Sequence, residues 1–498
     1  MSNDLFVFYK PKLRFILVLG LLVGIMLTIA TCSKKESIEY SLPPYPITEY
    51  HIEVDPDSLE YIYKNFVENH YINISLRIGN KVYNNAMMRI RGDSSRKLKK
   101  KSLKLKLPKG EKFDDGTRRI NLNAEYADFT FMHQYLSSKT MNDNNLICFK
   151  AGYAPVYINN IYFGLYLRVE NMDSDFLKSR NLSPKNNLYK ATRDYSCMID
   201  SNEVDSRWEK KTNTNDNNSA DLKNLIHQLN SLSNEEFEAF AKTHFFYDEM
   251  INIIALNMLI SNSSTYYHNY YMYHDNKKDK WRMFPWDLDK TFNPKHVDYN
   301  YQKTSWAEEE SSAINTNTLI ELFLVNENTL STIRKRIVKL QDSFNSESYE
   351  PQIDSLAKQI WPYISADKTG IIKSKKRWLA GLDQMMEYID ERPQSLLTQI
   401  DNKPINFIVN RQVKVSNNSA HITWGRSIDP NGLPITYTIH YSNKSGFKGD
   451  IKGKIEGLEN PAGVITNLAP GKYYFYIEAS NGNYKTYGHD IRNFFIVP

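Results

Sequence analysis

The stretch KWRMFPWDLD at residues 280–289 decides the fold of the central part of this chain. An alternating, largely apolar strand runs into two aspartates two positions apart, Asp287 and Asp289. Mg²⁺ prefers oxygen ligands and is typically held by one or two carboxylates together with a substrate phosphate. The stretch therefore predicts a magnesium platform at a strand end. The alternative is a strand end with two solvated acids, although the neighbouring Pro285 and Trp286 argue against a solvated loop.

A second stretch lies upstream, where RIRGDSSR at 89–96 is followed by a strand pattern at 102–107. Leucines alternate with lysines in this strand, which predicts one apolar and one cationic face. The cationic face could hold a polyphosphate. The alternative is a solvated edge strand whose lysines prevent aggregation.

A third stretch, NNIYFGLYLRVE at 159–170, reads as the turn and second strand of a hairpin. Glu170 ends this otherwise apolar strand. A carboxylate there could orient a lysine, as kinases use a Lys–Glu ion pair to position phosphates. An ordinary strand-end glutamate is the alternative.

The N-terminus has the pattern of an export signal: basic residues at 10, 12 and 14, an apolar run at 15–30, and then Cys32. IATC at 29–32 resembles the lipobox of bacterial lipoproteins, in which the cysteine carries the lipid. We therefore predict a signal peptide at 1–32, lipidation of Cys32, a polar tether at 33–45 and a lipid-anchored place in the bacterial cell envelope. An uncleaved anchor helix is the alternative, and it also places the rest outside the cytoplasm.

Composition indicates a folded protein of two or more domains: 498 residues, 41% hydrophobic and 24% charged. The formal net charge of +6 is small for this length and does not favour nucleic-acid binding. Cys148 and Cys197 could pair in an oxidising compartment, which spacing alone does not decide.

The pattern of elements predicts an α+β fold. The chain is expected to be β-rich from 46 to 107. A helix is expected at 131–141, a polar loop at 205–220, and strands at 270–274 and 281–284. Ser233 and Glu236 form a capping-box pattern that opens a helix to about residue 261. Helical patterns dominate 318–399.

The final segment, 404–498, is all-β in pattern and resembles a fibronectin type III module, with a generic immunoglobulin-like sandwich as the alternative. Trp424 takes a core position, and LAPGKYYFY at 468–476 resembles the stretch that carries the tyrosine corner. Nothing catalytic stands out in this segment, so a spacer or docking role is expected.

The three central stretches, taken together and in this order, resemble the spore-coat-protein-H (CotH) kinase family over residues 46–400. The resemblance implies an atypical protein-kinase-like domain that transfers phosphate from ATP to serine or threonine of an acceptor protein with Mg²⁺ or Mn²⁺. It further implies nucleotide-binding residues (Arg91, Ser95, Lys101, Lys104 and Glu170), metal-binding residues (Asn269, Asp287 and Asp289) and a catalytic part for Asn269 and Asp287.

One position departs from the family pattern. Family members carry an aspartate five residues before the asparagine that corresponds to Asn269, whereas this chain has Ser264 there. In kinases this aspartate accepts the proton of the substrate hydroxyl, which a serine does not do at neutral pH. Two hypotheses follow: a working phosphotransferase, or a catalytically degenerate kinase-fold surface protein that serves binding or assembly.

Overall fold

The computed structural model describes residues 47–126, 128–192, 196–198, 200–215, 218–292, 299, 317–372, 374–410, 412–444, 447, 452–488 and 494–498. The predicted signal peptide, Cys32 and the tether lie outside these residues. Among the residues described, no helix is both long and apolar enough to cross a membrane. Helices and sheets are both abundant, so the predicted α+β class is confirmed.

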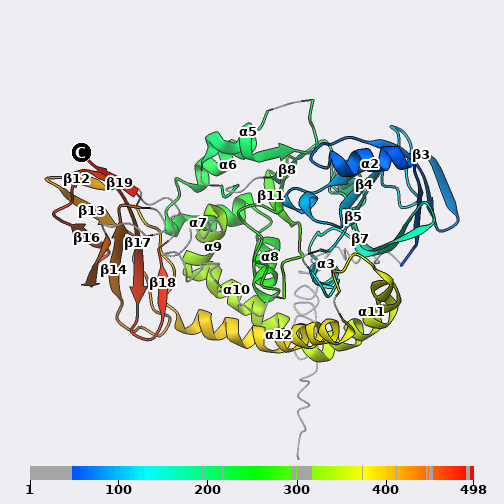
Figure 1. Cartoon of the computed structure of the whole chain (residues 1–498). Helices are drawn as coiled ribbons and strands as arrows, with labels where there is room; N and C mark the ends of the chain where they lie inside the picture. The colour runs from blue at the N-terminus through cyan, green and yellow to red at the C-terminus, as the bar shows by residue number, and fades with distance from the viewer. Residues whose placement is uncertain are drawn as a thin grey trace, which may run out of the picture.

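A closed barrel forms the first part of the described chain, at the right of Figure 1. Its strands follow the order β1-β2-β3-β4-β5-β7-β6, and β1 pairs in parallel with β6 to close it. The interior is packed with aliphatic and aromatic side chains, most of them from alternate positions of the strands. The barrel elements are β1 (Tyr50–Glu53), α2 (Pro56–Lys64), β2 (Ile72–Ile78), β3 (Lys81–Arg91), η1 (Ser94–Lys97), β4 (Ser102–Lys106), β5 (Arg119–Asn123), β6 (Ala151–Ile158) and β7 (Ile161–Glu170).

The predicted hairpin at 159–170 is present. Asn159 and Asn160 have φ of +49° and +64°, the left-handed values that a two-residue turn between twisted strands requires. Gly164 in the second strand has φ +130°, and a Cβ there would lie 2.5 Å from Asp367 Oδ2. The glycine therefore lets a distant carboxylate approach the strand closely.

A second sheet, of order β11-β10-β8-β9, and a set of helices form the next part. The helices and the sheet share one large core with the side of the barrel that faces them. The elements are α3 (His133–Asp143), α4 (Ser174–Lys178), β8 (Asn187–Ala191), η2 (Ser201–Glu203), α5 (Val204–Arg207), β9 (Trp208–Lys210), α6 (Ala220–Leu229), α7 (Asn234–His244), α8 (Tyr247–Leu259), β10 (Tyr270–Asp275), β11 (Lys280–Pro285), α9 (Thr318–Val325), α10 (Glu327–Leu340), α11 (Ser346–Ala366) and α12 (Lys375–Asn402).

Two sequence predictions in this part need correction. The capping box of Ser233 and Glu236 is present, but the helix it opens ends at His244, and α8 begins at Tyr247. The chain is extended at Phe245 because it bridges β11 there, with the Phe246 N–H donating to the carbonyl of Trp281 at 3.1 Å. The polar segment predicted as a loop also contains α5 and β9, since pairing with β8 gives this short edge strand its hydrogen bonds.

The last part of the described chain is all-β, as predicted. Strands β12, β13 and β16 form one sheet; β15, β14, β17 and β18 form another, with β19 beside β17. Trp424, Tyr437 and Phe475 belong to the core between them. The long helix α12 leads into this part (Figure 1). The strands are β12 (Lys414–Ser416), β13 (Ser419–Thr423), β14 (Thr436–Ser442), β15 (Lys452–Leu458), β16 (Ala462–Ile465), β17 (Gly471–Ser480), β18 (Lys485–Tyr487) and β19 (Phe494–Val497).

Cys148 and Cys197 are both buried and do not form a disulfide with each other.

His274 on β10 links the second sheet to α6 in a pH-sensitive way. Its Nδ1 lies 3.0 Å from Asp221 Oδ2, and its Nε2 lies 3.0 Å from Asp279 Oδ1. Burial lowers the pKa of His274, but hydrogen bonds to the two aspartates outweigh it, so the net pKa is raised. The charged imidazole therefore stabilises the fold below its unfolded pKa, and this contribution is lost as pH rises through the folded pKa.

We expect His274→Phe, which keeps the stacking on Trp281 at 4.3 Å, to cost about 1 kcal/mol more stability at about pH 5.5 than at about pH 9. Urea unfolding of both proteins at the two pH values measures this difference. An equal loss at both would show that the imidazole is not charged in the fold.

Candidate functional site

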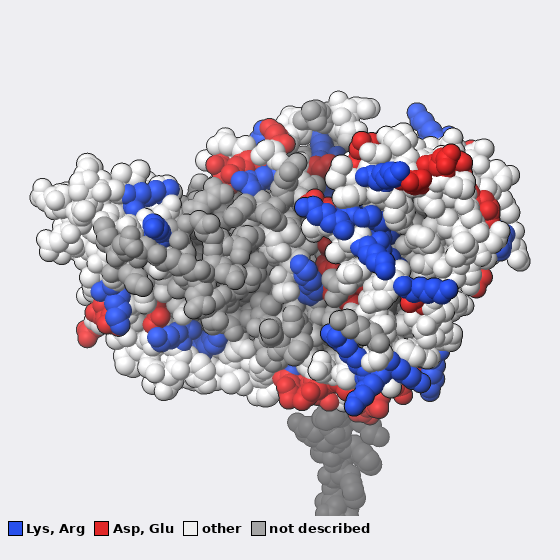
Figure 2. Space-filling model, in the orientation of Figure 1, with Lys and Arg blue, Asp and Glu red and all other residues white. Residues whose placement is uncertain are grey.

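The candidate site lies between the outer face of β3, β4 and β5 and the second sheet. Cross-strand partners share a face, so the register places Arg89, Lys104 and Asn121 side by side. The alternate residues Leu103 and Leu105 are fully buried inside the barrel. The predicted alternation of an apolar and a cationic face is therefore confirmed. In Figure 2, lysine and arginine side chains gather where the barrel adjoins the second sheet.

Trp286, in the 280–289 stretch, contacts both the outer face of the barrel and the second sheet. The Arg91 guanidinium lies 6.0 Å and the Lys190 ammonium 5.6 Å from the centroid of its ring. Both distances allow cation–π attraction, which fixes these long side chains against the indole. Arg91 also donates to Asn123 at the end of β5. The barrel and the second sheet thus both supply cations to the same place.

We call Arg91, Lys104, Lys190 and Lys211 the cationic cluster. Burial lowers the pKa of Lys104 far below its usual value, and Arg91 and Lys211 lower it further. Burial, Arg91 and Lys211 also lower the pKa of Lys190, to about 8, although Asp287 opposes them. The Lys104 ammonium donates to a neutral amide, Asn171 Oδ1, at 2.8 Å. Glu209 pairs with Lys211 at 2.7 Å and offsets part of this charge. The remaining positive charges are half-buried and lie close together, which favours an anionic ligand.

Asn121 adds a second sign of a ligand. It is 1% exposed, and neither its Nδ2 nor its Oδ1 has a hydrogen-bond partner. Buried amides are almost always satisfied, because an unpaired one costs about 1–3 kcal/mol. Its place beside Lys104 means that a polar ligand on the cationic cluster would also meet this amide.

The acidic side of the site is formed by Asp287 and Asp289, just beyond the end of β11, and by Glu125, just beyond β5. Asp287 has φ +58°, a left-handed conformation that is uncommon outside glycine. Burial and the neighbouring Asp287 raise the pKa of Asp289, which Lys290 partly opposes. Asp287 also acts on Arg91 and Lys190, so the acidic side adjoins the cationic cluster.

A divalent cation at these carboxylates would need further ligands. Within the described ranges, no three His, Cys, Asp or Glu side chains lie close enough to hold a metal by themselves. Mg²⁺ does not require three, because it keeps several waters and binds one or two carboxylates together with a substrate phosphate. The residues therefore fit a cation that shares its ligands with a phosphate on the cationic cluster.

Ser264 and Asn269 border this acidic side. The backbone N–H of Trp286 donates to the Asn269 carbonyl at 3.1 Å, which ties the two segments together. The Asn269 amide donates to both the hydroxyl and the carbonyl of Ser264, each at 3.0 Å. Ser264 is 3% exposed, so it is part of a buried turn. The metal role predicted for Asn269 would fall to its amide oxygen.

Three predicted nucleotide-binding residues are not brought to the cationic cluster by the contacts they make. Lys101 donates to the carbonyls of Arg96 and Leu98, at 2.5 and 3.0 Å, and so closes the loop before β4. Ser95 lies in η1 within the same loop. Glu170 accepts two hydrogen bonds from Arg180 at 2.9 and 2.6 Å, where a lysine partner was predicted. The reason is α4, because the chain just past the end of this helix brings Arg180 back to the end of β7.

Lys100 is the deeply buried lysine of this region, and sequence reasoning passed over it. It donates to Asp367 Oδ2 at 2.9 Å and to the Leu165 carbonyl at 2.5 Å, with its ammonium 4.6 Å from the Tyr166 ring centroid. A run of three lysines does not show which one turns inward. The pair ties the barrel to the end of α11.

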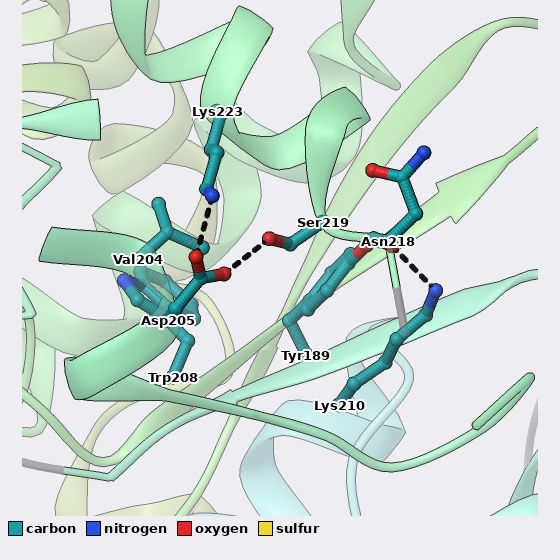
Figure 3. A pocket seen from close by; sticks show the side chains of 8 residues that line it. All are labelled: Tyr189, Val204, Asp205, Trp208, Lys210, Asn218, Ser219 and Lys223. Atoms are coloured by element: carbon teal, nitrogen blue, oxygen red, sulfur yellow. Dashed lines mark hydrogen bonds and ion pairs between the residues drawn. The ribbon is translucent and has the colours of Figure 1, made fainter. Parts of the chain in front are cut away.

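A separate pocket of about 370 Å³ lies beside β9. Figure 3 shows Lys223 and Ser219 pointing to Asp205, and Lys210 reaching the Asn218 carbonyl. Asp205 and Lys223 therefore pair with each other, and Lys210 is bound to a backbone carbonyl. Lys211, just beyond the end of β9, belongs to the cationic cluster.

Sequence reasoning also missed Lys190, Lys211, Asn121 and Glu125. Lys190 and Lys211 come from β8 and from just beyond β9, far from the lysine-rich strand in sequence. The alternation that marked Lys104 on β4 applies equally to Asn121 on β5, so that signal was available. For Glu125 we find no signal in the sequence.

Comparison with known proteins identifies the family. The family described as CotH kinase protein matches residues 88–396, which is more than half of the chain. The chain therefore belongs to the CotH kinase protein family. A relative, the inner spore coat protein H of Bacillus subtilis (strain 168), is 27% identical over 318 residues, which cover 61% of this chain and 84% of the relative.

Two solved structures show slight likeness. One, titled "Myokine structure", is 18% identical and covers 20% of this chain and 97% of its own, with a TM-score of 0.15. The other, rat CD45 extracellular domains d3–d4, is 22% identical and covers 17% of this chain and 46% of its own, with a TM-score of 0.14. Neither carries an argument about this fold.

Proposed function

We propose that this protein is an exported, membrane-anchored phosphotransferase that moves phosphate from ATP to serine or threonine of an acceptor protein. The observation that carries the proposal is the cationic cluster, with its unpartnered Asn121 amide, beside the carboxylates of Asp287 and Asp289. A nucleoside triphosphate with a divalent cation complements both the cationic cluster and the carboxylates. Family membership agrees with this reading.

The roles follow from charge. Arg91, Lys104 and the two lysines from the second sheet would hold the phosphates, while Asp287, Asp289 and the Asn269 oxygen would hold Mg²⁺ or Mn²⁺. When bound, the cation neutralises charge on the transferred phosphate. Phosphoryl transfer depends mainly on such positioning and neutralisation. Ser95, Lys101 and Glu170 would then support the loop and strand ends around the nucleotide.

A second candidate is a catalytically degenerate member that binds a ligand or assembles a surface structure. The observation that favours it is Ser264, whose buried hydroxyl is engaged by the Asn269 amide at the place where the family pattern has a proton-accepting aspartate. Such a protein could keep the cationic cluster and the neighbouring carboxylates and lose the phosphate transfer.

The all-β part is proposed as a fibronectin type III-like spacer or docking module. Tyr473 OH donates to the Ala469 carbonyl at 3.2 Å, as in the tyrosine corner of such sandwiches. Trp424 lies in the core, as the sequence predicted. Lipidation of Cys32 and a cell-envelope location complete the proposal, with a protein acceptor as partner and no nucleic acid.

The test is transfer of label from ATP to casein-like acceptors with Mg²⁺ or Mn²⁺, using the full-length protein beside Asp289→Ala. We expect the wild type to label the acceptor and the variant to be slower by about 100-fold or more. Equal labelling by both, or none by either, would contradict transferase activity. If neither protein labels the acceptor, thermal stabilisation by Mg²⁺ and ATP that is lost in Asp287→Ala would still show a nucleotide-binding site.

A further inference from the structure

Positive charge continues along the outer face of the barrel, past the cationic cluster. Arg89 on β3 lies opposite Lys104 in the strand register, and Lys106 lies two positions beyond Lys104 on β4. Alternate residues of a strand share a face and are about 7 Å apart. We call Arg89 and Lys106, together with the Tyr71 ring between them, the basic strip. In Figure 2, lysine and arginine side chains continue from the second sheet onto the barrel.

Neutral groups hold the two cations of the basic strip in place. The Arg89 guanidinium lies 5.4 Å and the Lys106 ammonium 4.3 Å from the centroid of the Tyr71 ring. Arg89 also donates to Asn69 Oδ1 and to the Ile90 carbonyl, each at 2.8 Å. In the part of the chain that the structure describes, neither cation forms an ion pair with a carboxylate. Two like charges are thus fixed against one aromatic ring, where both are half-buried.

The surroundings of the basic strip do not neutralise it. Arg119 lies opposite Lys106 on β5, but its charge is paired with Asp173 at 2.8 Å. Burial lowers the pKa of Lys106, and the charges of Arg118, Arg119 and Arg89 lower it further. Half-buried cations that meet no acid of their own favour an anionic partner from outside.

The spacing of the strip indicates which kind of partner fits. Arg89 and Lys106 are diagonal neighbours on adjacent strands, which places their Cα atoms roughly 7–8 Å apart. Alternate side chains of an extended peptide are also about 7 Å apart. Two carboxylates at alternate positions of an extended segment therefore match the two cations. A nucleic acid would require a longer basic surface that follows many phosphates.

We propose that the basic strip docks an acidic segment of the acceptor protein, with glutamate or aspartate at alternate positions near the serine or threonine that receives phosphate. This inference rests on the proposed function, because it names the class of acceptor for that site. Lys106 lies one strand step, about 7 Å, beyond Lys104. The acidic pair should therefore fall within about two to six positions of the acceptor hydroxyl.

The experiment compares two serine peptides as acceptors for the full-length protein. One carries two glutamates at alternate positions near the serine, and the other carries glutamines there. We expect the wild type to have a KM about 10-fold lower for the glutamate peptide. Lys106→Met should raise that KM by about 3- to 10-fold, and should change the KM for the glutamine peptide and for ATP by about threefold or less. Lys81→Met, at the far end of β3 where Lys81 pairs with Asp114, is the control and should behave as the wild type does.

Charge reversal gives a readout that a merely structural role would not produce. Lys106→Glu should prefer a peptide with lysines at the two positions over the glutamate peptide. If the wild type has the same KM for the glutamate and glutamine peptides, the inference is overturned and the proposed function stands. The same holds if Lys106→Met raises the KM for both peptides equally.

Binding measured without ATP separates the inference from the proposed function. Fluorescence anisotropy with the labelled peptides should show tighter binding of the glutamate peptide, and Lys106→Met should lose this preference. If no peptide is phosphorylated but this pattern holds, the proposed transfer fails and the strip stands as a site for acidic segments. If no peptide is phosphorylated and neither binds, both fail. If a single-stranded DNA oligonucleotide displaces the glutamate peptide and binds more tightly, the partner is a phosphate polymer and the inference is overturned.

Discussion

Arg180→Met is expected to lower the free energy of unfolding by about 3–5 kcal/mol, because it leaves the carboxylate of Glu170 buried without its partner. Arg180 and Glu170 are 2% and 4% exposed. The guanidinium also donates to the Cys148 carbonyl at 2.7 Å and lies 3.8 Å from the Phe176 ring centroid. Urea unfolding followed by tryptophan fluorescence measures the loss.

An exposed ion pair of the same chain serves as the control for this prediction. Arg334 pairs with Asp401, and their side chains are 40% and 39% exposed. Arg334→Met should cost roughly 1 kcal/mol or less, since solvent screens such pairs. A double change, Arg180→Met with Glu170→Leu, should recover part of the loss because no charge is left buried. Similar losses in the two single variants would show that the Glu170 pair is not buried in solution.

Lys104→Met is expected to weaken binding of an ATP analogue by roughly 30- to 1000-fold, equivalent to about 2–4 kcal/mol. The reason is its place at the centre of the cationic cluster, where charge-assisted bonds to a phosphate are poorly screened. Stability of the free protein should not fall, because Arg91 and Lys211 lose a like-charged neighbour. Isothermal titration calorimetry with Mn²⁺ and a non-hydrolysable ATP analogue measures the affinity, and thermal unfolding measures the stability.

Lys106 offers a matched control on the same strand. It lies two positions along, on the same outer face, with its ammonium 4.3 Å from the Tyr71 ring centroid. Lys106→Met should change the affinity by about threefold or less, as expected for a charge acting from a distance. Equal effects of the two changes would mean that the general positive field, and not a phosphate contact by Lys104, controls binding.

Local patterns in the sequence predicted what depends on neighbours along the chain. The leucine–lysine alternation before residue 107 set the two faces of β4, and the two asparagines at 159–160 set the hairpin turn. Ser233 and Glu236 set the start of α7. Each of these is a local property: strand period, left-handed turn residues, and a capped first turn.

The partners of charged groups could not be predicted in this way. Glu170 takes Arg180, and Lys100 takes Asp367, 267 positions away. Electrostatic partners are chosen by proximity after packing, which sequence distance does not report. For the same reason the helix that starts after Ser233 ends at His244, because Phe245 is needed beside Trp281.

The sequence by itself determined the family, the α+β class, the all-β end of the described chain and the strand that carries Asp287 and Asp289 to the site. Only the tertiary structure decided how the site is composed. It brought Lys190 and Lys211 close to Arg91 and Lys104, left the Asn121 side chain without a hydrogen-bond partner, and buried Glu125 where the charges of Asp289 and Asp287 help to raise its pKa. The physical reason is that barrel closure and docking on the second sheet bring together side chains whose positions no local pattern relates.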